Sequence, residues 1–488
     1  MSRLIVGPFN RVEGDLEVKL EIDGGAVCEA RVVSPLYRGF EQILRGKPPA
    51  DALVYAPRIC GICSVSQSVA AAEALAETQG VAMPANGRLA VNLIHAAENV
   101  ADHLTHFYLF FMPDFARAAY AGEDWYAEAA ERFTAVKGTA AQDMLPARAQ
   151  FMHVMGILAG KWPHTLGIQP GGSTRAVSAN ELARLAGVLA AFRRFLERHL
   201  FGDALERIAE LASAAELAAW AAERPARSSD FRHFLKISAA LGLENLGRAG
   251  DRFMSFGAYG AGGEGETAAL FRRGVFAPGG RVEALDAALI REDLSHAWYS
   301  PAAGAQAPFD GETRPDGDQQ DGYTWCKAPR LGGQVVETGA LARQAVDGHP
   351  LIRDLVAAGG GNVHSRVVAR LLEVALVVMA MEQWVEQIRP GERFIDHAVP
   401  PQAAQGMGLT EAARGALGHW LKVEKGVIAN YQIIAPTTWN FSPRDENGTP
   451  GALEQALVGA PVRAGETEPV AVQHVVRSFD PCMVCTVH

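Results

Sequence analysis

The sequence predicts an α+β fold that is predominantly helical with small antiparallel β-sheets, and three observations predict it. Apolar residues recur at helical spacing over long stretches of the chain. Alternating apolar and polar residues flank a glycine turn near the N-terminus. Strands and helices do not alternate regularly along the chain, which argues against a doubly wound parallel sheet. We expect a single domain over residues 1–488 with several lobes: a β-rich part (1–50), a mainly helical part (51–400) and a C-terminal part (401–488).

The N-terminal β-rich part contains the clearest strand signal. Apolar and polar residues alternate over residues 16–33, on both sides of Asp23-Gly24-Gly25, where glycine permits the positive φ of a tight turn. This pattern predicts a β-hairpin. Cys28 falls inside its second strand, and we expect it to be a small buried hydrophobic residue.

Helical spacing and capping residues predict the other elements. The predicted helices are 64–79 with Gly80 as its cap, 86–115 closed by Pro113, 181–199, 203–223, 365–388 and 452–459; residues 425–436 read as a strand, and 257–266 and 300–322 as loops.

One predicted helix carries a polar stripe. His95, Asn99, Asp102 and His106 are separated by steps of four, three and four, so they share one face. Such a stripe usually faces solvent, and the pattern alone leaves open whether it faces the interior.

Charge and hydropathy bear on partners and location. The net charge is −10, which argues against broad electrostatic binding to nucleic acid or to acidic membrane surfaces. The most apolar helical stretch, 371–381, is too short to cross a bilayer and contains Glu373. The N-terminal residues show no signal-peptide pattern. We therefore expect a cytoplasmic protein without direct membrane insertion.

The cysteines carry the strongest functional signal. Four of the six form two C-x-x-C pairs, Cys60 with Cys63 and Cys482 with Cys485, at opposite ends of the chain. Three interpretations compete: a structural zinc site, a redox dithiol, and a soft metal centre that performs chemistry.

The surroundings of the pairs weigh on this choice. Zinc ribbons keep their cysteine pairs within one small module, and no βαβ context accompanies either pair as in thioredoxin-like proteins. Arg58 and Asp480 each lie two residues before a pair, and His488 follows the second. Polar neighbours of this kind orient the ligands of catalytic metals, which favours the third interpretation without excluding the others.

The motifs resemble those of the large subunit of nickel–iron hydrogenases. The matching segments run from residue 10 to residue 488 and are "NRVEGD", "YRGFE", "RICGIC", "TEAARGALGHW", "APTTWNFSPRD" and "DPCMVCTVH". The resemblance implies the large-subunit fold of that family, with a central bundle of long helices. It also implies hydrogenase activity, the heterolytic cleavage of H₂.

The resemblance assigns the metal ligands. It implies that Cys60, Cys63, Cys482 and Cys485 bind nickel, and that Cys63 and Cys485 also bridge to an iron that carries one CO and two cyanides. It also implies a magnesium or similar divalent ion at the C-terminus. The ligands of that ion would be Glu41, the backbone carbonyl near Ile433, and His488, which would tie down a buried chain end.

The resemblance also assigns residues around the metals. Cys482 would accept a proton and Glu13 would pass it onward. Arg414 and Thr437 would face the cyanides, with Asp102 and Asp480 holding the arginine. By this resemblance the polar stripe is interior.

Several positions depart from the common pattern of the family. Gln67 and Asp15 replace frequent histidines, and Ala413 replaces a frequent proline. Ile62 and Phe110 are bulkier than the usual residues, and we expect them to narrow the gas channel unless they serve ordinary core packing. Together these departures resemble the regulatory, H₂-sensing subclass, which signals through a histidine kinase.

The remaining cysteines, Cys28 and Cys326, cannot form an iron–sulfur ligand set. The resemblance therefore implies an iron–sulfur small subunit as partner, in a heterodimer or a dimer of heterodimers. An energy-conserving uptake hydrogenase is the alternative to the sensor, and codons beyond His488 would favour it, because regulatory members are made without a C-terminal extension. A non-catalytic relative with structural zinc is the remaining alternative.

Overall fold

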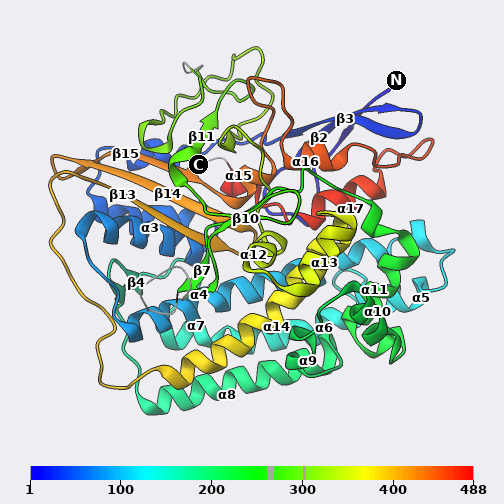
Figure 1. The fold of residues 1–488 in the computed structure, drawn as a ribbon, viewed down its shortest axis with the longest axis horizontal. Helices are drawn as coiled ribbons and strands as arrows, with labels where there is room; N and C mark the ends of the chain where they lie inside the picture. The colour runs from blue at the N-terminus through cyan, green and yellow to red at the C-terminus, as the bar shows by residue number, and fades with distance from the viewer. Residues whose placement is uncertain (1, 261–268, 301–303, 487–488) are drawn as a thin grey trace.

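The computed structural model describes residues 2–260, 269–300 and 304–486. It confirms an α+β fold with long helices and small antiparallel sheets (Figure 1). The helices are α1 (Phe40–Leu44), α2 (Ala52–Tyr55), α3 (Ser64–Gln79), α4 (Ala85–Thr105), α5 (Tyr126–Phe133), α6 (Thr139–Phe151), α7 (His153–Leu158), α8 (Ala179–Phe195), α9 (Leu205–Ala209), α10 (Ala214–Ala222), α11 (Asp230–Leu241), α12 (Ala340–Asp347), α13 (Pro350–Gly359), α14 (Val363–Gln387), α15 (Pro436–Asn440), α16 (Ala452–Leu457) and α17 (Val470–Ser478).

The strands form several separate sheets. They are β1 (Ser2–Val6), β2 (Glu17–Asp23), β3 (Ala26–Val33), β4 (Ile168–Gln169), β5 (Gly172–Ser173), β6 (Phe253–Ser255), β7 (Ala258–Gly260), β8 (Ala269–Phe271), β9 (Gly274–Phe276), β10 (Val282–Glu283), β11 (Ile290–Asp293), β12 (Ala328–Leu331), β13 (Ala404–Ala412), β14 (Gly415–Glu424) and β15 (Val427–Ile434). The three-stranded sheets β1-β2-β3 and β13-β14-β15 are antiparallel throughout.

The predicted N-terminal hairpin is confirmed as β2 and β3, whose pairing closes at Asp23 and Ala26. The prediction for Cys28 is wrong, because this residue is exposed. Successive side chains of a strand point to opposite faces. Val27 takes the inner face of β3, so Cys28 takes the outer one.

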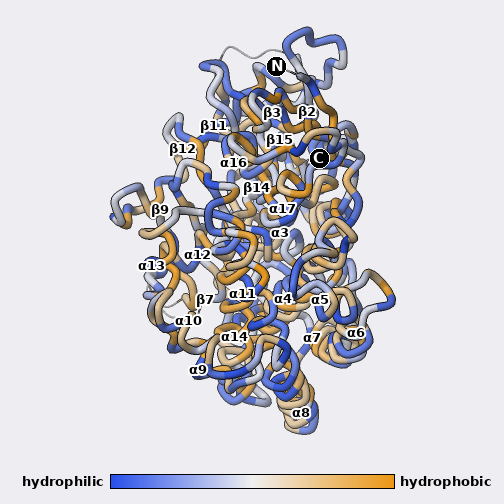
Figure 2. The backbone as a smooth tube through the Cα atoms, turned by 90° about the vertical axis from the view of Figure 1, so that its right-hand side faces the viewer, coloured by the Kyte–Doolittle hydropathy of each residue, from blue (hydrophilic) through white to orange (hydrophobic). Residues whose placement is uncertain are grey.

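Long helices form the centre of the molecule. In Figure 1, α4 and α14 run beside each other through the middle, and their contact is among the most extensive helix pairings. Figure 2 shows hydrophobic stretches along these helices and more hydrophilic loops near the N-terminus. The polar stripe of α4 lies inside this core: His95, Asn99, Asp102 and His106 are all buried. No helix of the described residues is long and apolar enough to cross a membrane.

Two predicted helices differ from the structure. The helix predicted over 86–115 is α-helical to Thr105 and continues as a π-helical segment, His106–Phe111, before a 3₁₀ turn that contains Pro113. The helix predicted over 203–223 is two helices, α9 and α10. The chain restarts at Ser213, whose hydroxyl accepts from the Glu216 amide and caps α10, so this local signal overrides the continuous apolar pattern.

Further predictions are confirmed or extended. The helices predicted over 64–79, 365–388 and 452–459 correspond to α3, α14 and α16, and the strand over 425–436 corresponds to β15. The predicted loop 257–266 begins with the short strand β7, and its residues 261–268 lie outside the described residues, as do 301–303 of the loop 300–322.

A buried ion-pair network joins the central helices. Arg343 of α12 donates to both carboxylate oxygens of Glu373 in α14, at 2.7 and 3.0 Å, and to Glu411 of β13 at 2.7 Å. His103 of α4 lies 3.1 Å from Glu373. Burial acts to raise the pKa of Glu373, but Arg343 and His103 outweigh it and lower the pKa to about 2. The network therefore holds a charged carboxylate inside the core.

We expect Glu373→Gln to lower the free energy of unfolding by about 3 kcal/mol at pH 7, because it leaves the buried Arg343 short of one negative partner. A carboxylate whose pKa is lowered by folding stabilises the folded state at pH values above its ordinary pKa of about 4.3. The stability advantage of the wild type over the variant should therefore shrink as the pH falls toward 2. Chemical denaturation at several pH values measures both effects. Glu386→Gln, exposed on the same helix, is the control, and an equal loss there would contradict the assignment.

Candidate metal centre

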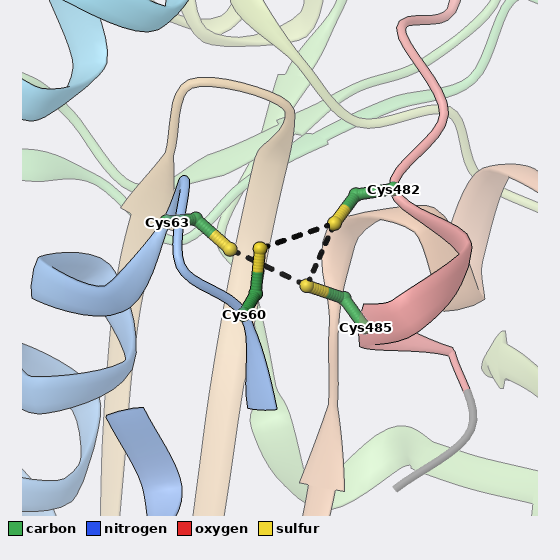
Figure 3. Close-up of side chains that lie close together, drawn as sticks. All are labelled: Cys60, Cys63, Cys482 and Cys485. Carbon is green, nitrogen blue, oxygen red and sulfur yellow. Dashed lines mark hydrogen bonds between the residues drawn. The ribbon is translucent and has the colours of Figure 1, made fainter. Parts of the chain in front are cut away.

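The two cysteine pairs meet at one buried site (Figure 3). The four sulfur atoms all lie within 4.8 Å of one another. Cys60 Sγ is 3.5 Å from Cys482 Sγ, Cys63 Sγ is 3.3 Å from Cys485 Sγ, and Cys482 Sγ is 3.0 Å from Cys485 Sγ. The six cysteines all fall within the described residues, and none forms a disulfide. Four converging, buried thiols fit a soft metal.

The start of α3 and the packing of β13 on this helix set the position of the first cysteine pair. Cys63 is the N-cap residue just before α3, so its side chain projects from the N-terminal end of the helix. Strand β13 packs closely on α3, and a Cβ at Gly408 would overlap the carbonyl oxygen of Ala70. Glycine at this position is therefore what allows the sheet to support the helix that carries Cys63.

The second pair is held by the N-terminal segment. Cys485 lies in a 3₁₀ turn, Met483–Cys485, that follows α17. The Glu13 amide donates to the Pro481 carbonyl at 3.3 Å, and the Met483 amide donates to the Glu13 carbonyl at 2.7 Å. These two bonds flank Cys482 on both sides, so residues from opposite ends of the chain close the site together.

The thiols and Glu13 influence one another. Hydrogen bonds from Cys482, Cys485 and Cys63 lower the pKa of the Cys60 thiol well below its ordinary value. Burial raises the pKa of Cys482. For Glu13, burial and the negative charge of Cys60 raise the pKa, whereas Arg414 and Arg38 oppose them. Without a bound cation, the four thiols and Glu13 therefore favour a protonation state with few negative charges.

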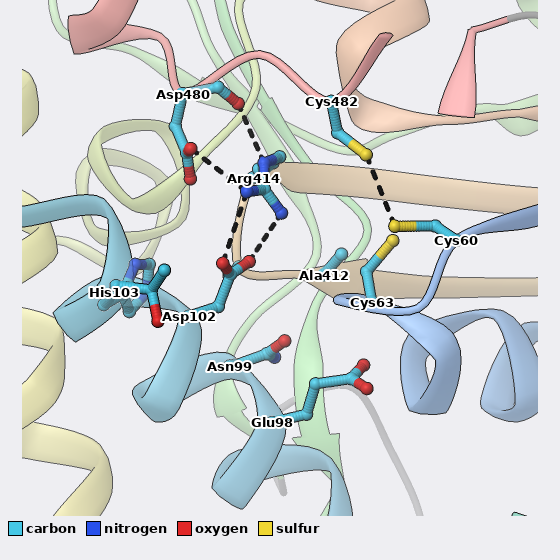
Figure 4. Close-up of polar contacts among 12 residues, drawn as sticks. Cys60, Cys63, Glu98, Asn99, Asp102, His103, Ala412, Arg414, Asp480 and Cys482 are labelled. Carbon is cyan, nitrogen blue, oxygen red and sulfur yellow. Dashed lines mark hydrogen bonds and ion pairs between the residues drawn. The ribbon is translucent and has the colours of Figure 1, made fainter. Parts of the chain in front are cut away.

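Arg414 lies beside the sulfur atoms on a two-residue hairpin turn between β13 and β14 (Figure 4). Its guanidinium donates to both oxygens of Asp102, at 2.6 and 3.2 Å, and to Asp480 at 3.1 Å. It also donates to the Asp480 backbone carbonyl at 2.9 Å. All three residues are buried. Burial acts to raise the pKa of Asp480, but Arg414 and other cations lower it. Asp102 and Asp480 therefore hold the Arg414 guanidinium in one orientation.

Two more predicted residues contact the cysteine segments. Thr437 Oγ1 accepts a hydrogen bond from the Cys482 amide at 3.1 Å. Gln67, one turn into α3, accepts through Oε1 from His419 Nε2 at 2.8 Å. Because that nitrogen donates, His419 Nδ1 in its neutral form accepts from the Tyr431 hydroxyl, 2.8 Å away. His419 and Tyr431 are site neighbours that no sequence pattern predicted.

The predicted ion site is described in part. Glu41 Oε1 accepts from the Ile433 amide at 2.9 Å, whereas His488 lies outside the described residues. Lys327 Nζ lies 2.9 Å from Glu41 and 3.6 Å from Glu292. Gln432 Oε1 accepts from the same ammonium at 2.8 Å. The structure therefore brings Glu41 and Ile433 together and adds an ammonium that the sequence analysis did not predict.

The residues that depart from the common pattern occupy different places. Ile62, between the first two cysteines, is half-buried and packs against the main core. Phe110 is half-buried in the π-helical segment. Asp15 is exposed, and Ala413 is buried in the hairpin turn beside Arg414.

Glu98 is another residue that the sequence analysis missed. It lies one position before Asn99 of the predicted stripe, and its carboxylate contacts the first turn of α3 (Figure 4 shows its place below Cys63). Burial raises its pKa to about 8, although hydrogen bonds from Val65, Ser66 and Trp162 oppose that shift. The available signal in the sequence was the position of Glu98 directly before Asn99 of the polar stripe, which the structure shows to be buried.

Comparison with known proteins identifies the family. The model of the nickel-dependent hydrogenases matches residues 38–142 and 234–488. The periplasmic [NiFeSe] hydrogenase large subunit of Desulfomicrobium baculatum is 30% identical, and the match covers 100% of this chain and 95% of that protein. The uptake hydrogenase large subunit of Rhizobium leguminosarum bv. viciae is 26% identical, with coverage of 100% and 95%.

Solved structures agree with this match. An [NiFeSe] hydrogenase structure from Desulfomicrobium baculatum superposes with a TM-score of 0.84 at 30% identity, and one from D. vulgaris Hildenborough with a TM-score of 0.84 at 29% identity; each match covers 100% of both chains. The fold, the four converging cysteines and these similarities lead to one conclusion. The chain is a member of the nickel-dependent hydrogenase family, a hydrogenase large subunit that provides the nickel–iron active site.

Proposed function

We propose that this chain oxidises H₂ as the catalytic subunit of an uptake-type [NiFe] hydrogenase. The observation that carries the proposal is the set of four buried thiols with a fixed arginine beside them. The names of the relatives, an uptake hydrogenase and a periplasmic [NiFeSe] hydrogenase among them, support this role rather than a sensor.

The resemblance to the family supports a division of the ligands. Cys60 Sγ lies 3.5 Å from Cys482 Sγ and Cys63 Sγ lies 3.3 Å from Cys485 Sγ, while Cys482 Sγ and Cys485 Sγ are 3.0 Å apart. By that resemblance, Cys60 and Cys482 would hold nickel alone, and Cys63 and Cys485 would hold both nickel and iron. When bound, the nickel–iron centre supplies the place where H₂ is split heterolytically.

The chain itself moves the proton and holds the ligands of the iron. Cys482 Sγ accepts the proton, and the Glu13 carboxylate receives it, because backbone pairing holds residue 13 against the Cys482 segment. Asp102 and Asp480 hold the Arg414 guanidinium in place, and it would face an anionic cyanide. Thr437 Oγ1 accepts from the Cys482 amide, and its hydroxyl hydrogen would donate to a second diatomic ligand.

The oxygen atoms around Glu41 support a hard cation near the C-terminus. Two carboxylates, Glu41 and Glu292, and the Gln432 amide oxygen surround Lys327. Such oxygen donors suit Mg²⁺. We propose that Glu41, the Ile433 carbonyl and His488 bind this ion, and that Lys327 balances the remaining charge.

The proposal includes a partner. The relatives are named as large subunits or large chains, which supports a heterodimer with an iron–sulfur small subunit. A cytoplasmic location and a single domain over the whole chain stay predictions. One relative is named periplasmic, so fractionation of cells decides the location.

Infrared spectroscopy and metal analysis of the purified protein test the function. We expect one nickel and one iron per chain, bands of CO and cyanide stretching, and H₂ oxidation with an artificial electron acceptor. Zinc in place of nickel and iron, without those bands, would contradict the proposal and favour a structural zinc protein.

An H₂ sensor that signals to a histidine kinase is the second candidate. The observations that favour it are the replacements Gln67 and Asp15, and the bulky residues Ile62 and Phe110. We expect Ile62→Val with Phe110→Leu to speed inactivation by O₂, because smaller side chains widen a gas route. Inactivation rates at fixed O₂ measure this, and an unchanged rate would assign both residues to packing. Turnover coupled to autophosphorylation of a kinase would support the sensor.

We expect Arg414→Lys to lower the rate of H₂ oxidation by about a hundredfold while the metals remain bound. A lysine ammonium cannot make the paired contacts of a guanidinium with Asp102 and Asp480 at once. Rates and metal content of the purified variant measure the two effects. Lys422→Arg, on the solvent-accessible part of β14, is the reverse exchange and should change neither.

A further inference from the structure

The first turn of α3 has an unusual cap. The residue at its N-cap is Cys63, and no side-chain hydrogen bond from this residue caps the helix. Helices normally satisfy their first free amides with a serine, threonine or aspartate at this position. Here the sulfur atom of Cys63 is directed to Cys485 instead, so another group has to accept those hydrogen bonds.

Glu98 of the neighbouring helix α4 accepts them. Its Oε2 accepts from the Val65 amide at 2.8 Å, and its Oε1 accepts from the Ser66 amide at 2.9 Å. These two amides are the ones that an N-cap side chain would bind. The carboxylate therefore replaces, from another helix, the cap that Cys63 does not provide.

Three further donors hold the Glu98 carboxylate in place. The Trp162 indole donates to Oε2 at 2.9 Å, and the hydroxyls of Ser64 and Ser66 donate at 3.3 and 3.2 Å. Glu98 is 2% exposed. Its described hydrogen bonds come from amides, hydroxyls and an indole, and none from an arginine or lysine, so fixed dipoles keep this group in one orientation.

The loop that carries Trp162 also contacts both sides of the first cysteine pair. His164 Nδ1 donates to the Pro57 carbonyl at 2.9 Å, ahead of Cys60. The His164 amide donates to the Ser64 hydroxyl at 3.2 Å, just after Cys63. Glu98 and this loop thus enclose the segment from residue 57 to residue 66.

We propose that Glu98 is a positioning residue for the metal centre: by capping α3 in place of Cys63, it leaves the Cys63 sulfur to bridge the metals and sets its direction. The proposal rests on the bridging role assigned to Cys63 above. Its structural part, the cap, does not depend on a metal, so the two can fail separately.

The test is Glu98→Gln in the full-length, purified protein. A glutamine keeps one acceptor oxygen but turns an NH₂ group toward a backbone amide, so one capping bond is lost. We expect hydrogen–deuterium exchange at the amides of Val65 and Ser66 to become about tenfold faster, with the rest of α3 unchanged. We also expect shifted infrared bands of the diatomic ligands on iron, because a bridging thiolate has moved.

Glu454→Gln is the matched control. Glu454 is buried and accepts from the Val32 amide at 3.0 Å and the Tyr323 hydroxyl at 2.8 Å, and none of its described contacts involves the first cysteine pair. Exchange at residues 65 and 66 and the infrared bands should stay as in the wild type. Equal changes in both variants would overturn the proposal in favour of general loss of core stability.

Trp162→Phe is the second variant, needed if Glu98→Gln does not fold. It removes one donor to Glu98 and keeps an aromatic ring. We expect severalfold faster exchange at the same two amides and a smaller band shift in the same direction. Wild-type exchange in both variants would overturn the capping role. Faster exchange with unshifted bands would overturn the role in positioning Cys63. Absence of the bands in the wild type would count against the proposed function and leave the exchange result to decide the cap.

Discussion

Cys485→Ser is expected to yield a folded chain that has lost its nickel and iron. A serine hydroxyl remains protonated where a thiol gives up its proton to a metal, and its oxygen is a hard donor that suits nickel poorly. Cys485 Sγ lies 3.0 Å from Cys482 Sγ and 3.3 Å from Cys63 Sγ, so it is central to the sulfur group. Metal analysis should show at least about tenfold less nickel than in the wild type, and H₂ oxidation should disappear with it.

Cys326→Ser is the matched control, because Cys326 is buried but is not among the four converging cysteines. Burial raises the pKa of the Cys326 thiol, so it stays protonated, as a serine hydroxyl would. Metal content and activity should match the wild type, apart from a modest loss of stability. Nickel retained in Cys485→Ser, or lost equally in Cys326→Ser, would show that the four thiols are not the ligands.

The cysteine pairs were predictable because the spacing within each pair is local and the pairs are few. The same holds for α3, which ends at a glycine cap, and for the hairpin of β2 and β3, whose turn requires glycine. That the two pairs meet was not derivable from spacing alone. It followed from the resemblance of motifs at both ends of the chain to one family.

The supporting residues could not be predicted from local pattern. Glu98 caps α3 from another helix, and Arg343 joins Glu373 to Glu411 across three elements. Such contacts link residues far apart in sequence, and a single glutamate or arginine in a helix usually marks a solvent-exposed face. Lys327 beside Glu41 is a similar case.

Two errors were local, and their physical reasons differ. For Cys28, the alternation of the strand decides which face each side chain takes, and residue type alone gave the wrong face. For residues 203–223, a serine that caps a new helix interrupts an apolar pattern that reads as continuous. In both cases a single hydrogen-bonding or register detail outweighs the average preference of the segment.

Glu13→Gln is expected to retain the metals and lose most of the H₂ oxidation, by about 10²- to 10⁴-fold. The backbone bonds between residue 13 and the Cys482 segment do not involve the side chain, so the site should assemble normally. The glutamine amide keeps the shape of the carboxylate but cannot accept and release a proton near neutral pH. Isotope exchange between H₂ and deuterated water isolates this step, since it requires proton transfer but no electron acceptor.

Glu17→Gln separates proton transfer from a general change of charge near the N-terminus. Glu17 opens β2, four residues after Glu13, and is also partly exposed, but none of its described contacts involves the cysteine segments. Its variant should exchange isotopes at the wild-type rate. If Glu13→Gln also exchanged at that rate, the proton would have to leave Cys482 by another group. If Glu13→Gln lost nickel instead, the carboxylate would serve assembly of the site, because a pure proton carrier has no effect on metal content.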